Sequence, residues 1–555
     1  MNDAVEIPSL VGARALVIDR ANEMRAALGT GLAEFGVETI DYVGKPADAL
    51  ARINAHAYDV VLCEYDLGQG FDGLHLFESC QQHQLLKPSC IFMMITGERR
   101  LAQVMGAVEL VPDGYLLKPF SGAEFANRLA RALKRKGGFR RIDAAVRSGD
   151  YQGAIAACDR EIHLRPLEAP EFQRMKGHLQ LMIAEYAAAE TTYRQAMSQR
   201  QAPWAQMGLG RALFGLKDYS SARTCFEAVS SQYELMIQAY DWLARTQNAQ
   251  GDPKGAQSTL GRALQRSPLV AQRQRAMGRL AERNGELQQA EGALTQALEL
   301  SRGSFWREPA IYGELGRVQV ARSDVGAARR TMQRLRTDFK GDTSAEVIGQ
   351  LVEAAVLEAL DDHKRSEQMF RAACEQLDAL EDVPANVLLE ASRHAYARQQ
   401  KERGEHFARA ALRSAHDDAE LLASVEGLYL AQGDAETGRR LIENATRDIA
   451  DINNLAIDAA KAGDLQRAAE HFITGLAAVK GNVQVLLNAA NTLLTCVNQE
   501  GWNERYMTLV NQYLQRVRRL DPANGKARQL NEAFRRTQFR YGIDAETGRK
   551  TGSIS

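Results

Sequence analysis

Short runs of consecutive apolar residues recur near the N-terminus of the chain, and stretches with helical spacing separate them. Each run has about the length of a strand; the runs fall at residues 16–19, 58–64, 92–97 and 114–120. Continuous apolar runs of this length are typical of strands that are buried on both faces. Strands that alternate with helices predict a parallel sheet, in which functional groups gather at the carboxyl ends of the strands.

Polar and aromatic residues stand at or near the ends of these predicted strands. They are Asp19, Arg20, Glu64, Thr96, Tyr115 and Lys118. Together with the strands, these residues make the segment 13–136 resemble the receiver domain of two-component response regulators. The resemblance implies a flavodoxin-like α/β fold with a parallel five-stranded sheet.

The chemistry of the receiver family is the transfer of a phosphoryl group to an aspartate. Its members hold Mg²⁺ with two acids after the first strand and with the acceptor aspartate after the third. A threonine contacts the phosphate, and a lysine neutralises it. By resemblance, the first acid, the hydroxyl, the ammonium and the switch aromatic are Asp19, Thr96, Lys118 and Tyr115.

Two positions depart from this pattern. Arg20 stands where the second acid belongs, and Glu64 stands where the acceptor aspartate belongs. Mg²⁺ needs hard oxygen ligands, so a guanidinium removes a ligand and adds repulsion. The carboxylate of a glutamate lies one methylene further out than that of an aspartate, which spoils in-line attack. We therefore expect a degenerate phosphoacceptor pocket that is not phosphorylated in the usual way, with neither a metal nor a cofactor.

The role of this pocket has several interpretations. Arg20 and Glu64 are expected to form an internal ion pair where metal and phosphate would otherwise lie. In one interpretation both residues are remnants of a lost site. In another, Glu64 lies near Lys118 and Thr96 and holds an active-like state permanently through a charge-assisted hydrogen bond. Asp66 is an alternative, shifted acceptor, although Glu64 would then be buried inside the strand.

The pattern changes after Gly137, where the chain becomes almost wholly helical and a pair of residues, usually large then small, recurs. The pairs are Leu209-Gly210, Leu243-Ala244, Met277-Gly278 and Leu315-Gly316, at spacings of 34, 34 and 38 residues. The small residues let helices approach closely, and the large ones fill the space between them. Residues 138–540 resemble tetratricopeptide repeat (TPR) proteins, which implies an all-α superhelical solenoid with a concave groove. Residues 541–555 are expected to be a flexible tail.

An arginine follows each of these pairs, at a position that faces the groove in the TPR family. The four arginines are Arg211, Arg245, Arg279 and Arg317. In one interpretation they form a track for an acidic partner segment, because guanidinium groups bind carboxylates in a bidentate way. In the other, they pair with acids on neighbouring helices and simply solubilise the groove. Asn488 and Asn491 resemble the asparagines of the family's carboxylate clamp, without the lysines that accompany them there.

Composition and motifs exclude several classes of function. The 555 residues include 69 basic and 70 acidic residues, so the overall charge does not favour nucleic acid. The 7 cysteines are scattered without a CxxC pair, which indicates neither a disulfide framework nor a zinc site. No apolar run has the length of a membrane span, and the N-terminus lacks the basic region of a signal peptide. No phosphate loop or other catalytic motif is found.

The sequence thus predicts a non-catalytic signalling adaptor or scaffold in the bacterial cytoplasm, within a two-component-type pathway. Its partners would be other signalling proteins, bound through the groove, with no membrane insertion. The alternatives are a phosphorylatable response regulator of a phosphorelay and an RNA-binding helical-repeat protein.

Overall fold

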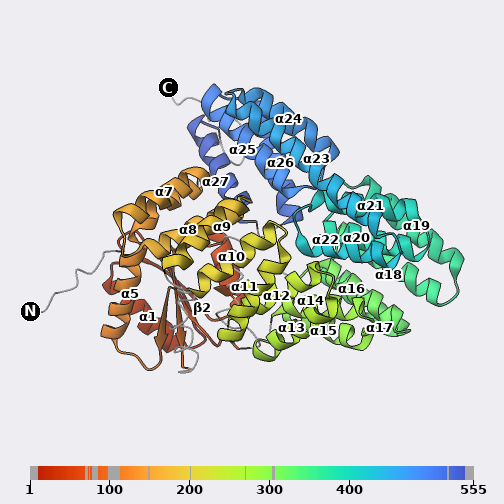
Figure 1. Ribbon diagram of the computed structural model, residues 1–555, viewed down its shortest axis with the longest axis horizontal. Helices are drawn as coiled ribbons and strands as arrows, with labels where there is room; N and C mark the ends of the chain where they lie inside the picture. The colour runs from red at the N-terminus through yellow and green to blue at the C-terminus, as the bar shows by residue number, and fades with distance from the viewer. Residues whose placement is uncertain are drawn as a thin grey trace, which may run out of the picture. The chain divides into compact units, whose positions relative to one another are not determined.

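The fold is described from a computed structural model. It describes residues 10–68, 73, 76–77, 80, 85–97, 113–147, 150–199, 202–234, 236–268, 270–302, 307–521 and 524–543. The chain divides into two compact units, Met1–Arg273 and Gln274–Ser555. Figure 1 shows strands in red and orange near the N-terminus, followed by helices from yellow to blue.

The first unit opens with a parallel five-stranded sheet. Its strands are β1 (Arg14–Ile18), β2 (Thr39–Val43), β3 (Val60–Glu64), β4 (Ile91–Thr96) and β5 (Gly114–Leu117). They lie in the order β2-β1-β3-β4-β5, and each neighbouring pair is parallel. Between β1 and β3 the order changes direction, and at such a switch point the strand ends leave room for functional groups. The predicted flavodoxin-like α/β fold is confirmed.

Apolar side chains fill both faces of the central strands. Every residue of β4 is buried, and so is β3 up to and including its terminal Glu64. Burial on both faces explains the unbroken apolar runs of these strands. The sheet is accompanied by α1 (Asn22–Glu34), α2 (Pro46–Ala55) and α5 (Gly122–Lys136). Phe35, at the end of α1, meets Phe125 of α5 edge to face, with 6.5 Å between ring centroids.

The receiver-like segment runs into the following helices without a long linker. A single turn of 3₁₀ helix (Gly137–Phe139) joins α5 to α6 (Arg140–Arg147). The ring of Phe139 stacks on that of Phe172, with 4.8 Å between centroids. The buried carboxylate of Asp143 accepts a hydrogen bond from the backbone N of Ser89, at 2.8 Å, just before β4. The buried polar contact therefore fastens α6 to the segment before β4, and the stacked pair joins the 3₁₀ turn to the helices that follow.

Removal of the Asp143 carboxylate should loosen this junction. Asp143→Ala leaves the backbone N–H of Ser89 without its acceptor, which costs about 1–2 kcal/mol. Burial raises the pKa of Asp143, and the hydrogen bond from Ser89 opposes this effect only in part. The negative charge of Asp143 therefore adds little to the stability of the fold. Asp143→Asn, which keeps an acceptor oxygen, should therefore remain close to wild type. Urea unfolding and limited proteolysis near residue 139 compare the variants; an unchanged Asp143→Ala protein would contradict the prediction.

Helices that pack in sequence make up the rest of the first unit. They are α7 (Tyr151–Leu164), α8 (Ala169–Met182), α9 (Tyr186–Gln199), α10 (Pro203–Gly215), α11 (Tyr219–Gln232), α12 (Ile237–Ala249) and α13 (Pro253–Arg266). Each packs against the next, as expected for hairpins whose neighbours in sequence are neighbours in space.

The second unit begins within α14 and continues the helical pattern. Its helices are α14 (Ala271–Arg283), α15 (Leu287–Leu300), α16 (Pro309–Ala321), α17 (Val325–Asp338), α18 (Thr343–Ala359), α19 (His363–Ala379), α20 (Ala385–Ala397), α21 (Lys401–Ser414), α22 (Ala419–Ala431), α23 (Ala435–Lys461), α24 (Leu465–Ala478), α25 (Val483–Glu500), α26 (Glu504–Leu520) and α27 (Gly525–Arg540). The predicted all-α, TPR-like repeat region is confirmed.

Small residues let the helices of a hairpin approach closely, as the repeat pattern predicts. Gly210 of α10 lies against the ring of Phe226 of α11, where an added Cβ would come within 2.6 Å of the ring. Gly316 of α16 faces Met332 of α17 in the same way, at 2.9 Å. A larger residue at either position would push the two helices apart.

One helix of the second unit is twice the usual length. Asp434 and Asp464 cap the starts of α23 and α24. These two helices therefore begin where the repeat pattern places the second helix of a hairpin. The 27 residues of α23 nevertheless continue without a turn through the position where the next hairpin should begin. Ala445 of α23 belongs to one hydrophobic core, and Ile449 belongs to the next.

The chain remains packed just beyond the last helix. The hydroxyl of Tyr541 donates to the carbonyl of Val497 at 3.0 Å, and its ring contacts that of Trp502. The remainder of the predicted tail, residues 544–555, lies outside the described residues. In the described part of the chain, no helix is long and apolar enough to span a membrane.

Candidate functional site

Three charged side chains meet at the carboxyl ends of the parallel strands. Asp19 follows β1, Glu64 ends β3, and Lys118 follows β5. The ammonium of Lys118 lies 2.8 Å from Oδ2 of Asp19 and also forms an ion pair with Oε2 of Glu64. The other oxygens accept backbone hydrogen bonds, from Ala21 to Asp19 at 2.8 Å and from Asp66 to Glu64 at 3.3 Å. Both carboxylates are thus held in place, and one ammonium bridges them.

The pKa of Lys118 reflects this bridge. Burial alone would lower it, but the hydrogen bonds and charges of Asp19 and Glu64 outweigh burial and raise the pKa above its ordinary value. Opposite charges at such short range favour the charged form of a lysine. Lys118 is therefore held as an ammonium. Its positive charge offsets one of the two carboxylates, so the three side chains together carry one negative charge.

Two further residues that match the receiver family lie on the strands β4 and β5. Thr96 ends β4 and is buried, and its carbonyl accepts a hydrogen bond from the backbone N of Lys118 at 2.8 Å. Tyr115, on β5, is also buried. The structure thus brings Asp19, Glu64 and Lys118 together, with Thr96 at the end of the adjacent strand, and Arg20 does not join them.

The expected ion pair between Arg20 and Glu64 is wrong. Arg20 is exposed and forms no ion pair with any described residue. Its guanidinium lies instead over Gly68, where an added Cβ would come within 2.6 Å of Nη1. The physical reason is that Lys118 approaches Glu64 from the end of β5 and occupies the position that Arg20 would need.

Asp66, the alternative acceptor, has a local role. It is exposed, and its Oδ1 accepts a hydrogen bond from the backbone N of Gly68 at 2.9 Å. Gly68 has a positive φ of 70°. Short aspartate side chains commonly stabilise turns in this way. Glu64 is buried and is the last residue of β3.

The pocket does not fit Mg²⁺. That cation demands several oxygen ligands in tight octahedral geometry. Here the two carboxylates, Asp19 and Glu64, are already bridged by Lys118, and Arg20 stands where a third acid would be needed. Among the described residues, no group of three or more histidine, cysteine or acidic side chains is placed to hold a metal.

The four arginines of the repeats divide into two chemically different pairs. In the first unit, Arg211 of α10 and Arg245 of α12 lie over the same indole ring, that of Trp242. The guanidinium carbons are 5.3 Å and 5.1 Å from the ring centroid. Each guanidinium therefore forms a cation–π contact with the same ring.

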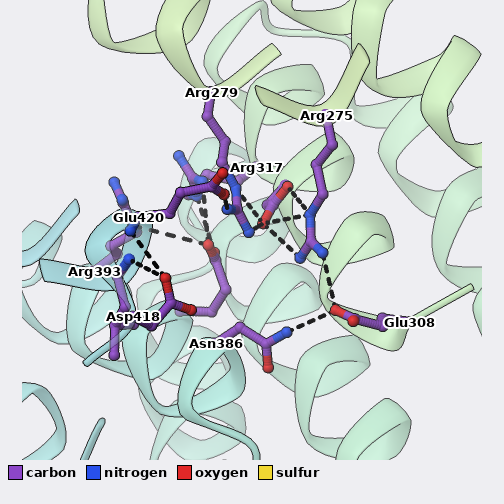
Figure 2. Close-up of polar contacts among 11 residues, drawn as sticks. Arg275, Arg279, Glu308, Arg317, Asn386, Arg393, Asp418 and Glu420 are labelled. Carbon is purple, nitrogen blue, oxygen red and sulfur yellow. Dashed lines mark hydrogen bonds and ion pairs between the residues drawn. The ribbon is translucent and has the colours of Figure 1, made fainter. Parts of the chain in front are cut away.

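In the second unit, the corresponding arginines belong to a dense set of ion pairs, which Figure 2 shows. We call this set the arginine–glutamate cluster; it consists of Arg275, Arg279, Glu282, Glu308, Glu314, Arg317, Asn386, Glu390, Arg393 and Glu420. The members lie on or next to α14, α16, α20 and α22, so the cluster joins helices that are far apart in sequence.

Glu314 of α16 is the centre of one half of the cluster. It is only 4% exposed and accepts hydrogen bonds from Arg275, at 2.9 Å and 3.0 Å, and from Arg279, at 2.7 Å. Arg275 also pairs with Glu308 at 2.9 Å, and Arg279 reaches Glu420 of α22 at 3.2 Å. Arg279 therefore connects α14 to both α16 and α22.

Arg317 of α16 is the centre of the other half. Its Nε lies 3.0 Å from Oε2 of Glu390 on α20, and its Nη1 forms an ion pair with Glu282 of α14. Glu390 is buried and also lies 3.9 Å from Arg393. Charge-assisted pairs of this kind are among the strongest hydrogen bonds in proteins when they are shielded from water.

The pKa values of the cluster follow from burial and from the surrounding charges. Burial would raise the pKa of Glu314, but the charges and hydrogen bonds of Arg275 and Arg279 lower it to about 2. Burial, followed by the nearby charge of Arg317, lowers the pKa of Arg393 to about 10. Glu314 and Arg393 are therefore both charged at neutral pH.

For Arg279 and Arg317, the structure has the arrangement of the second interpretation, in which the arginines pair with acids on neighbouring helices. The carboxylates that pair with these two arginines come from other helices. No spacing within one helix could therefore have indicated the pairings.

A lysine that the sequence analysis did not identify accompanies Asn488. The ammonium of Lys526, on α27, donates to Oδ1 of Asn488 at 3.0 Å, and Asn488 in turn donates to Oδ1 of Asn453 at 3.0 Å. Burial lowers the pKa of Lys526. Lys526 stands 38 residues after Asn488, a spacing that matches the longer repeats, and this spacing could have indicated it.

Comparison with known proteins identifies the first of the two regions. Residues 15–130 match the model of the response regulator receiver domain. Chemotaxis protein CheY-3 of Vibrio cholerae is 24% identical over 120 residues, which are 22% of this chain and 91% of CheY-3. Transcriptional regulatory protein CutR of Streptomyces coelicolor is 31% identical over 123 residues, which are 22% of this chain and 54% of CutR. The chain therefore carries a response regulator receiver domain, joined to TPR-like helical repeats.

Solved structures with similar helices include two TPR proteins. A tetratricopeptide repeat protein from Parabacteroides merdae is 11% identical, covers 44% of this chain and 93% of its own, and has a TM-score of 0.32. TTC0263, a thermophilic TPR protein from Thermus thermophilus, is 21% identical, covers 34% and 100%, and has a TM-score of 0.26. These scores are low, and the description of the repeats rests on their own helices and packing.

Proposed function

We propose that this protein is a non-catalytic signalling adaptor of a bacterial two-component-type pathway. In this proposal, a receiver that is not phosphorylated is joined to helical repeats that bind a protein partner. The observation that carries the proposal is the contact of Lys118 with both Asp19 and Glu64. In the receiver family this lysine neutralises the phosphate on the acceptor aspartate. Here the carboxylate of Glu64 makes that contact without a phosphate.

The same contact supports the interpretation of Glu64 as a fixed activator. Its carboxylate supplies to Lys118 part of the negative charge that a phosphoryl group supplies in the family. A charge-assisted contact in a partly buried pocket biases a two-state domain by about 1–3 kcal/mol. The buried position of Tyr115, the switch aromatic, is consistent with one fixed state. The alternative, that Glu64 is a remnant, predicts that Glu64→Gln leaves partner binding unchanged.

The partner that the arginines favour is another signalling protein with an acidic segment. We assign this contact to Arg211, because Arg279 and Arg317 already hold carboxylates of their own chain. The pathway implies a cytoplasmic location. The balance of 69 basic and 70 acidic residues gives RNA binding no support.

Phosphorylation of the purified protein tests the proposal. We expect no adduct by intact-mass analysis after incubation with acetyl phosphate and Mg²⁺, because the pocket lacks both an aspartate acceptor and a second acid. A receiver with an intact aspartate, treated in the same buffer, serves as the positive control. A stoichiometric, hydroxylamine-labile adduct on the wild-type protein would instead establish the phosphorelay alternative.

A further inference from the structure

The segment that joins the receiver to the repeats is strongly basic. From Arg128 to Arg141 the sequence contains seven basic residues and no acidic residue, although the whole chain has 69 basic and 70 acidic residues. The segment covers the second half of α5, the 3₁₀ turn and the start of α6. Positive charge is thus concentrated at one place in a chain whose overall charge is balanced.

Three of these basic side chains are exposed and form no ion pair with any described residue. They are Arg131, Lys134 and Arg140. Lys134 lies about one helical turn after Arg131, so both share one face of α5. Three other arginines of the segment have acids nearby, at distances longer than a hydrogen bond; Arg128, Arg135 and Arg141 lie 3.7 Å, 3.9 Å and 3.8 Å from Glu124, Glu171 and Glu161. The segment therefore presents three uncompensated cations and three loosely paired ones.

Two exposed leucines lie beside the basic segment. Leu164 ends α7 and Leu167 lies in the turn before α8, and their side chains are 67% and 96% exposed. Arg165, which stands between them, approaches the 3₁₀ turn, because a Cβ added to Gly137 would lie 3.7 Å from its Nη1. Apolar side chains thus project into solvent next to a group of basic side chains.

The acids around the two leucines do not cancel the positive charge. Glu161 is buried and lies between Arg165, at 3.1 Å, and Arg141, at 3.8 Å. Glu168, at the start of α8, is half-buried and forms no ion pair with a described residue. It is a single carboxylate beside three uncompensated cations, so the surface as a whole is positive.

We propose that this surface docks the protein on a membrane that contains anionic phospholipids. We call it the basic–leucine surface; it consists of residues 128–141 and 164–167. Its guanidinium and ammonium groups contact the lipid phosphates, and its two leucines enter the boundary between headgroups and acyl chains. The cytoplasmic leaflet of cell membranes carries such anionic lipids. The proposal goes beyond the adaptor function and does not depend on it.

The leucines favour a membrane over a nucleic acid as the anionic partner. Surfaces that bind single-stranded nucleic acid combine basic groups with exposed aromatic rings, on which the bases stack. Phe139, the aromatic residue of the basic segment, is instead buried and stacks on Phe172. Leucine side chains that project from a surface gain free energy by leaving water for the lipid boundary. A protein partner would need an apolar pocket that matches both leucines.

The position of the basic–leucine surface leaves the receiver pocket free. The ammonium of Lys136, at the end of α5, donates to the carbonyls of Pro88 and Cys90, just before β4, at 3.0 Å and 3.2 Å. The surface therefore lies near the amino ends of the strands, whereas Lys118 and Glu64 lie at their carboxyl ends. A receiver that is docked in this way keeps its pocket away from the lipid.

Co-sedimentation of the full-length protein with vesicles tests the proposal. We expect binding to vesicles made of phosphatidylglycerol and phosphatidylcholine in equal amounts, weaker binding as the salt concentration rises, and no binding to pure phosphatidylcholine. The triple variant Arg131→Gln, Lys134→Gln, Arg140→Gln should bind about tenfold more weakly or less, because it removes the three uncompensated cations. All three side chains are exposed, so the fold should be unchanged.

Two further variants separate the basic–leucine surface from net charge. Arg330→Gln, Arg336→Gln, Lys340→Gln removes the same charge from exposed side chains on and after α17 that have no ion pair with a described residue, and it should bind as wild type does. Leu164→Ser, Leu167→Ser keeps every charge and should bind about fivefold more weakly. Equal urea midpoints for all variants would show that they remain folded.

The proposal is contradicted if wild-type protein does not bind the anionic vesicles, or if the triple variant in the basic segment binds them equally well. Equal losses in both triple variants would refute it, since net charge alone would then explain binding. Full binding by the leucine variant would also overturn it and leave only adsorption of cations. Binding to a single-stranded oligonucleotide, without binding to vesicles, would assign the surface to nucleic acid instead. None of these measurements requires the signalling partner or the state of the receiver pocket.

Discussion

Replacement of Glu314 by glutamine is expected to destabilise the second unit by about 3–5 kcal/mol, the usual cost of breaking a buried ion pair. Glu314 is 4% exposed and accepts hydrogen bonds from both Arg275 and Arg279. Without its charge, two shielded guanidinium groups face a neutral amide whose nitrogen is itself a donor. The effect should appear as a lower urea midpoint for the helical signal of the full-length protein.

The pH dependence of the same variant gives an independent check. The pKa of Glu314 in the folded protein is lowered to about 2, below its ordinary value in an unfolded chain. A depressed pKa stabilises the fold above the unfolded value, and this stability is lost as the pH falls from about 5 towards 2. Glu314→Gln should lack that component, so its stability should fall less steeply in this range.

Glu405→Gln is the matched control for Glu314→Gln. Glu405 also pairs with an arginine, Arg409 one helical turn on, but both side chains are well exposed. Exposed pairs contribute little, so this variant should unfold with wild type. A common midpoint for Glu314→Gln and Glu405→Gln would show that the cluster does not stabilise the unit.

The double substitution Arg20→Asp, Glu64→Asp should convert the receiver from unreactive to phosphorylatable. It restores the second acid that Mg²⁺ needs and withdraws the acceptor carboxylate by one methylene. Asp19, Thr96 and Lys118 already lie at the same edge of the sheet. We expect a Mg²⁺-dependent, hydroxylamine-labile adduct with acetyl phosphate, seen by intact-mass analysis.

The single substitutions separate the two reasons for the lack of phosphorylation, the missing aspartate acceptor and the missing second acid. Glu64→Asp alone provides an acceptor without a complete metal site, and Arg20→Asp alone provides the acid without an aspartate acceptor. Each should therefore react far less than the double variant, and Arg20→Asn with Glu64→Asp should fall between them. A double variant that stays unreactive while it remains folded would show that other parts of the pocket have also changed.

The fold was largely predictable because its strongest signals are local. The central strands are buried on both faces, so each appears in the sequence as an apolar run, and the repeat spacing revealed the hairpins. β2 was not singled out, because at the edge of the sheet most of its residues are exposed or only partly buried. The length of α23 was also missed. The sequence keeps the repeat pattern of two hairpins in this segment, although the structure has one unbroken helix there.

The site was predictable in its members, and the sequence left open whether Arg20 or Lys118 would pair with Glu64. The strand ends brought Asp19, Glu64 and Lys118 together as expected, because parallel strands end at a common edge. The choice of Lys118 over Arg20 as the partner of Glu64 depends on the directions of side chains, which the sequence does not specify. The same limit applies to Arg279, whose partner Glu420 lies 141 residues away.

The continuous helix α23 also affects how the second unit can open. In a chain of repeats, partial unfolding places a boundary between ordered and disordered hairpins, and this boundary is usually a loop. Within α23, such a boundary would have to interrupt a continuous helix that is about 40 Å long. The interruption would fall between Ala445 and Ile449, which belong to different hydrophobic cores. Amide hydrogen exchange should therefore be faster in other helices of the second unit than in α23. The backbone amides of the two halves of α23 should exchange at similar rates, because the two halves open together.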